Sequence, residues 1–196
     1  MRVRVMVATM VLAGCTTIGS AQMPANAPAP AAGSMVAPSN AADELLDLFE
    51  KQLMGVAKEM PAEKYSFAPS ARTFAASQSA KYEGVRTFAQ QVAHLAQANY
   101  YFYSVVSGQK PDTDVKAISG MTSKDQLVAA LQASFDFAHK ANATLTAANA
   151  FEEIKGADGM HSRIGVANFA VAHGYDHYGQ LVEYLRMNGF VPPGSK

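Results

Sequence analysis

The chain has 196 residues, of which 49% are hydrophobic and 16% charged, and it contains one cysteine. This length predicts a single domain with a core large enough to fold without disulfides, and the lone cysteine excludes an internal disulfide and a cysteine-based zinc cluster. Sixteen basic residues balance sixteen acidic ones, so the composition argues against nucleic acid as a partner.

Residues 1–21 have the pattern of a secretory signal. Arg2 and Arg4 precede an apolar run, residues 5–13, that is too short to span a bilayer as a mature helix. The sequence therefore predicts an exported protein of a bacterial cell envelope.

Two cleavage sites compete within this signal. Residues 12–15 (Leu-Ala-Gly-Cys) resemble a bacterial lipobox, in which Cys15 becomes the lipidated first residue. The small residues 19–21 instead favour ordinary cleavage after Ala21, and an uncleaved anchor is the third option. The product is either a membrane-anchored lipoprotein or a soluble periplasmic protein, with membrane contact only through the signal or the lipid.

The next segment, residues 22–40, is rich in Ala and Pro, carries no charge and has no periodicity. These features predict a disordered tether.

From residue 41 onward, apolar residues recur every three or four positions, which predicts amphipathic helices. In the first helix, Asn40 is the expected N-cap, acidic residues are expected in the first turn, and Pro61 marks the end. Its expected apolar stripe comprises Leu45, Phe49, Leu53, Val56 and Met60.

Three further helices are expected after a long connection over residues 61–84. The second covers residues 85–106 and ends near Gly108, and the third begins at Thr122 or Ser123 with a capping box. The fourth covers residues 163–188 and ends at Gly189. No segment alternates convincingly as a strand, so the sequence predicts an all-α four-helix bundle over residues 41–193, whose long connections allow a crossover topology.

The chain carries five histidines, and two of them form the sharpest chemical signal. His173 and His177 are four residues apart in the fourth predicted helix, which places both rings on one face. Two imidazoles so placed can bind one transition metal, although buried neutral histidines held by other hydrogen bonds are an alternative. Gly174 stands where a zinc protease has its Glu, which excludes that motif. Asp176 is expected to be solvated, and a supporting role next to the metal ligands is the alternative.

His94 lies midway along the second predicted helix among small and apolar residues. It is either a core residue or a third ligand that would leave coordination positions open. His139 is expected at the surface or rim of the bundle, and His161 in a loop before the fourth helix.

The ordered set of motifs resembles the DinB-like (YfiT-type) superfamily of metal-dependent bundles. The residues that carry the resemblance are the segment 60–69 (Met-Pro-Ala-Glu-Lys-Tyr-Ser-Phe-Ala-Pro), the His94 segment 86–95, His173-x3-His177, and residues 178–193. The resemblance implies an up-down-down-up bundle with a divalent metal, zinc or nickel with iron as an alternative, held by His94, His173 and His177. Characterised relatives include thiol-dependent transferases.

Two functions follow from the resemblance and the export signal. The first is a metal-dependent hydrolase or thiol-type transferase acting on an unknown small molecule. The second is a non-catalytic module of the cell envelope that binds a metal or small ligand. A metal-free interaction protein is a third reading, and a homodimer is one option for its assembly. Packing or interface polarity is the preferred role for the polar side chains considered as acid–base groups, which are Tyr100, Tyr101, Tyr103, Tyr175, Tyr178 and Gln180.

Overall fold

Four long helices dominate the computed structural model, which describes residues 31–73, 75 and 77–196. Residue contacts divide the chain into two units, Met1–Ser34 and Met35–Lys196, and the helices and strands described here lie in the second. The predicted signal, which includes Cys15, lies outside the described residues. Residues 22–30 of the predicted tether lie outside them as well. The four helices are α1 (Pro38–Glu59), α2 (Phe88–Ser107), α3 (Lys124–Asn142) and α4 (Arg163–Met187).

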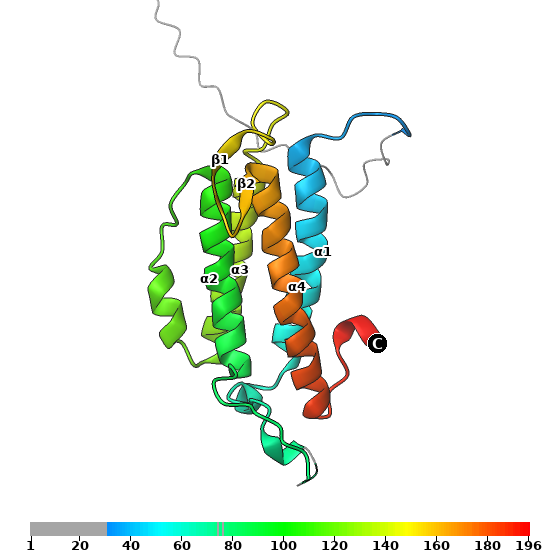
Figure 1. The fold of residues 1–196 in the computed structure, drawn as a ribbon, viewed down its shortest axis with the longest axis vertical. Helices are drawn as coiled ribbons and strands as arrows, with labels where there is room; N and C mark the ends of the chain where they lie inside the picture. The colour runs from blue at the N-terminus through cyan, green and yellow to red at the C-terminus, as the bar shows by residue number, and fades with distance from the viewer. Residues whose placement is uncertain (1–30, 74, 76) are drawn as a thin grey trace, which may run out of the picture. The chain divides into compact units, whose positions relative to one another are not determined.

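The helices form an up-down-down-up bundle, as predicted. In Figure 1, α1 and α4 run in one direction, whereas α2 and α3 both run in the other. Parallel neighbours need a crossover. Here it is the connection after α2, which contains the 3-10 helix Val115–Gly120 and passes along the outside of the bundle.

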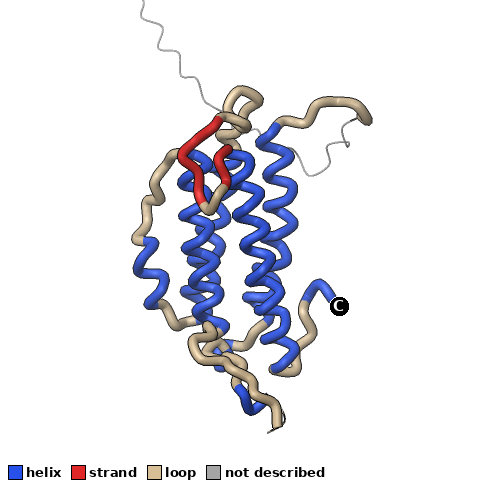
Figure 2. The backbone as a smooth tube through the Cα atoms, in the orientation of Figure 1, coloured by secondary structure: helices blue, strands red, loops and turns tan. Residues whose placement is uncertain are grey.

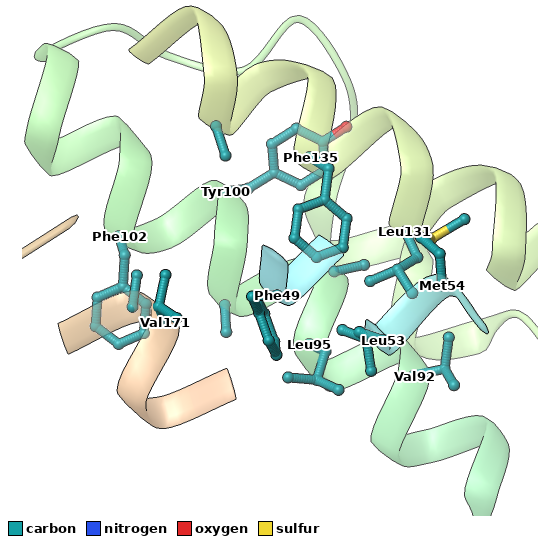
Figure 3. Close-up of a cluster of buried hydrophobic side chains, with 14 of the residues drawn as sticks. Phe49, Leu53, Met54, Val92, Leu95, Tyr100, Phe102, Leu131, Phe135 and Val171 are labelled. Atoms are coloured by element: carbon teal, nitrogen blue, oxygen red, sulfur yellow. The ribbon is translucent and has the colours of Figure 1, made fainter. Parts of the chain in front are cut away.

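Apolar stripes on the four helices meet in one core (Figure 3). Phe49 and Leu53 of α1, for example, lie beside Leu95 of α2 and Leu131 of α3. The expected stripe of α1 was wrong at one position, because Leu45 is 39% exposed and its neighbour Leu46 is buried. Among the described residues, no helix is both long and apolar enough to span a membrane.

Several predicted helix ends were wrong. Asn40 is not the cap of α1, since the helix starts at Pro38 and has no acidic residue in its first turn. Proline is well suited to this first position, because its φ is preset and its missing N–H is not needed there. The helix thus takes in the last three residues of the predicted tether. Ser123 does precede α3, but its side chain makes no capping hydrogen bond.

Other ends agree with the prediction or add to it. Gly108 ends α2 and Gly189 follows α4, both with positive φ. A capping box that the sequence analysis did not identify starts α2: Thr87 Oγ1 accepts from the Gln90 N–H, and the Thr87 N–H donates to Gln90 Oε1. The long connection before α2 holds two short 3-10 helices, Ala62–Lys64 and Ala71–Thr73.

The absence of strands was also predicted wrongly, because a short hairpin precedes α4 (Figure 2). Its antiparallel strands are β1 (Glu153–Ala157) and β2 (Met160–Ser162). Asp158 and Gly159 form the turn with φ of 49° and 81°, the left-handed conformation that two-residue hairpin loops favour. Such a short hairpin leaves too few residues for a clear alternating pattern.

Candidate metal centre

Three histidine rings come together between α2 and α4, which pack against each other. His94 Nε2 lies 3.2 Å from His173 Nε2. The ring centroid of His177 lies 4.6 Å from that of His94 and 4.8 Å from that of His173. One nitrogen from each ring can be chosen so that all three lie within 4.8 Å of one another. The two distant segments predicted to supply these rings therefore do converge.

The helix periodicity sets this arrangement on α4. His173 and His177 are one turn apart, so their rings share a face. Between them, Gly174 packs directly on Phe49 of α1, and a Cβ at this position would overlap the Phe49 ring. The missing side chain allows α4 to approach α1 closely at the turn that carries both histidines.

The rings differ in their access to solvent. His177 is only 6% exposed, whereas His94 and His173 are half-buried. Phe102 and Phe169 pack near His173, with ring centroids 5.5 and 6.4 Å from its own. His173 is thus flanked by two aromatic side chains, and His94 and His173 each keep part of their surface exposed.

Burial keeps two of the rings neutral. It lowers the pKa of His94 to about 4, with the charges of Arg86, His177 and His173 acting in the same direction. Burial is also the main reason why the pKa of His177 is lowered. Neutral imidazole is the form that binds a metal, so no proton has to leave either ring at neutral pH.

The donor geometry fits one metal ion. Two nitrogens bound to a tetrahedral ion at about 2.0–2.1 Å stand about 3.3 Å apart, close to the His94–His173 separation. A hydrogen bond between the two rings would give a similar distance. However, His177 Nδ1 is buried without a hydrogen-bond partner among the described residues, and an unpaired polar atom is costly there. The three histidines could therefore hold an ion. One ring nitrogen of His177, Nδ1, lacks a hydrogen-bond partner among the described residues.

A pair of glutamines lies one turn away from the histidines on each helix. Gln91 Nε2 donates to Gln180 Oε1 at 2.6 Å, and Gln180 Nε2 in turn contacts Asp176 Oδ2 at 3.3 Å. Gln91 is 2% exposed, and its Oε1 has no partner among the described residues. The sequence analysis missed Gln91, although its spacing of three residues from His94 could have indicated it. Asp176 is exposed, as expected.

The other two histidines do not join the cluster. His139 lies between carboxylates of α1 with its side chain 25% exposed, which agrees with a rim position. His161 lies exposed on β2, which agrees with a position just before α4 but not with a loop.

The tyrosines considered as acid–base groups differ in their surroundings. Tyr100 stacks near Phe137, and Tyr175 lies between Phe49 and Tyr178. Tyr103 is buried in the core, whereas Tyr101 is 54% exposed. Tyr100, Tyr103 and Tyr175 therefore make packing contacts, whereas Tyr101 lies largely in solvent.

The fold and the site together define a class of protein. Its members are four-helix bundles with a crossover connection and a three-histidine cluster between the second and fourth helices. The family model of the DinB superfamily matches residues 45–181. The chain belongs to this superfamily, and all three histidines lie within the matched span. None of the curated proteins matches the chain.

Proposed function

We propose that His94, His173 and His177 bind one divalent transition metal. The observation that carries this proposal is the convergence of three ring nitrogens within 4.8 Å, from helices distant in sequence. Imidazole donors suit zinc, nickel and iron, and zinc or nickel is expected from the resemblance to relatives.

The bound metal would serve an enzyme of the metal-dependent hydrolase or thiol-type transferase class, acting on an unknown small molecule. A metal held by three protein ligands can lower the pKa of a bound water or thiol and so supply a nucleophile at neutral pH. The partial exposure of His94 and His173 would let a small molecule approach such a metal, and Phe102 and Phe169 would shield His173 from water.

One observation favours a non-catalytic alternative, a binding module for a metal or small ligand. Within the described part of the chain, no carboxylate hydrogen-bonds any of the three rings, and the nearby amide groups of Gln91 and Gln180 cannot act as acid–base groups near neutral pH. An export signal would also place the protein away from the reduced thiols of the cytoplasm. Activity assays with the metal restored would separate the two functions.

The proposal includes export to the cell envelope. Mass spectrometry of the mature N-terminus tests this part directly. A lipidated Cys15 or a chain that starts at Gln22 would support export, whereas an intact Met1 in a cytoplasmic fraction would contradict it.

The metal proposal is tested by elemental analysis of the full chain purified from its own compartment. We expect close to one transition metal ion per chain, and loss of most of it in His94→Ala and His177→Ala. His161→Ala is the matched control, because His161 lies exposed on the hairpin. Wild-type protein without metal above background, or equal loss in the control, would contradict the proposal.

The same preparations distinguish the two candidate functions. Metal-loaded wild-type protein is screened for hydrolysis and for thiol transfer, with His177→Ala as the inactive reference. Turnover that depends on the metal supports the enzyme. Metal binding without any turnover supports the binding module.

A further inference from the structure

The face between α2 and α4 is arranged in successive layers of side chains. The two helices run in opposite directions (Figure 1), so later residues of α2 face earlier residues of α4. Gln91 of α2 meets Gln180 of α4, with 2.6 Å between Nε2 and Oε1. In the next layer His94 meets His177, with ring centroids 4.6 Å apart. Because a helix rises about 1.5 Å per residue, the glutamine layer lies about 4.5 Å from this histidine layer.

Each of these two layers contains one buried polar atom without a hydrogen-bond partner. The atoms are Gln91 Oε1 and His177 Nδ1, and among the described residues nothing hydrogen-bonds either of them. Both are shielded from solvent, and unpaired buried polar atoms are uncommon because each costs free energy. The two atoms are complementary, since an amide oxygen accepts hydrogen bonds and a protonated ring nitrogen donates them.

A chain of contacts determines which end of the Gln91 amide is left unpaired. The carboxylate of Asp176 can only accept, so it selects Nε2 of Gln180, which lies 3.3 Å from its Oδ2. Gln180 therefore directs its Oε1 at Gln91, which donates from its Nε2. The contact with Asp176 thus leaves Oε1 of Gln91 as a free acceptor.

A neighbour on α4 indicates the direction in which this oxygen lies. Burial raises the pKa of Tyr184, and a hydrogen bond with Gln91 opposes that rise. In Gln91 only the Nε2–H can donate to the hydroxyl. Tyr184 follows Gln180 by one helical turn, so it lies on the side away from His177. Since the Nε2 flank of the amide faces Tyr184, the Oε1 flank faces the histidine layer.

Metal binding would give His177 a use for such an acceptor. His94 and His173 approach each other through Nε2, with 3.2 Å between these atoms. A neutral ring that binds a metal through Nε2 carries its proton on Nδ1. That second N–H commonly donates to an outer acceptor, which fixes the orientation of the ring.

We propose that Gln91 is a positioning residue of the metal centre, a role that rests on the proposed metal binding. Its Oε1 accepts a hydrogen bond from His177 Nδ1–H, while His177 Nε2 binds the ion. Asp176 and Gln180 support this contact, because they hold the Gln91 amide in the required orientation.

The test compares the Zn²⁺ affinity of variants of the full chain, measured by competition with a chromophoric chelator. Gln91→Met keeps the size of the side chain but removes the acceptor, and its affinity should fall about 10- to 100-fold. Gln91→Glu retains an acceptor and should recover most of that loss.

Gln97→Met is the matched control and should keep the wild-type affinity. Gln97 follows His94 by three residues in α2, just as Gln91 precedes it by three. Its Nε2 donates to the Val115 carbonyl of the crossover connection rather than to α4, so the substitution removes a comparable hydrogen bond away from the metal centre.

The position of the proton is tested without any variant. Long-range ¹H–¹⁵N NMR of the Zn²⁺-loaded wild-type protein should show His177 bound through Nε2 and protonated at Nδ1. The opposite arrangement would overturn the proposal, as would equal affinities of Gln91→Met and Gln97→Met or a Gln91→Glu protein as weak as Gln91→Met. Wild-type protein that binds no Zn²⁺ would contradict the metal site itself, whereas the other results would contradict only the role of Gln91.

Discussion

At the scale of single residues, Gly174 has a clear structural role, because its lack of a side chain lets α4 pack on Phe49. We expect Gly174→Ala to lower the free energy of unfolding by about 1–3 kcal/mol, as overpacked cores do. It should also lower the metal content, since the displaced turn carries His173 and His177. Urea denaturation and elemental analysis measure the two effects.

Gly179 is the matched control for this substitution. It lies in the same helix, and a Cβ there would meet no atom within 4 Å. Gly179→Ala should raise stability by about 0.5–1 kcal/mol, because alanine favours the helix. Equal effects of the two substitutions would show that the Phe49 contact does not position α4.

His94 allows a second prediction at this scale. Its pKa is lowered to about 4, mainly by burial, so its ring should titrate near pH 4 in protein treated with a chelator. In the unfolded chain it titrates near 6.5, so the unfolded state binds more protons between these values. This histidine therefore reduces stability as the pH falls from 6.5 to 4. Proton NMR of the ring measures the midpoint, and a value near 6.5 would be inconsistent with a buried neutral ring.

At the scale of the helices, His139 links α3 to α1. Its hydrogen bond to Asp43, assisted by Glu50 and opposed by burial, raises the pKa of His139 to about 9. The folded state thus holds this proton more tightly than the unfolded chain, whose histidine titrates near 6.5. The stabilisation is complete below pH 6.5 and is lost as the pH rises through 9.

The expected loss is about 2 kcal/mol, allowing for the partial exposure of the pair. It should be seen as a lower urea midpoint at pH 9 than at pH 6.5 in chelator-treated protein. His139→Ala should remove most of this pH dependence. If the variant kept the wild-type slope, the link between α1 and α3 would not be electrostatic.

The helices themselves could be predicted from sequence because their apolar spacing is regular, as in the buried series Leu127, Leu131 and Phe135 of α3. Their ends were harder, because caps depend on a few local contacts. Pro38 starts α1 in place of Asn40, and the capping box of α2 is at Thr87. The carboxylates around His139 could not be foreseen, since residues about 90 positions apart meet only when the bundle packs.

For the whole molecule, the bundle topology and the three-histidine cluster could be predicted from the ordered motifs that carry the resemblance to the DinB superfamily. The short hairpin before α4 did not, because only its Asp158–Gly159 turn carries a strong local signal. Gln91 was missed as well, although it lies three residues from His94, because the sequence does not show that it meets Gln180 of α4.

A metal held by both α2 and α4 should stabilise the entire fold. A ligand present at 100 times its dissociation constant adds about 2.7 kcal/mol to the free energy of unfolding. For a protein of this size, that corresponds to a rise of about 5–10 °C in Tm. Differential scanning calorimetry of wild-type protein, with and without chelator, should show this shift. The His173→Ala protein should show little of it, and an equal shift there would place the stabilising metal elsewhere.

The most direct test of the central claim is anomalous X-ray diffraction from crystals of the full chain grown with its native metal. The account predicts one anomalous peak at about 2.0–2.2 Å from a ring nitrogen of each of His94, His173 and His177. A map in which these rings hydrogen-bond to one another, with the peak elsewhere or no peak at all, would contradict it.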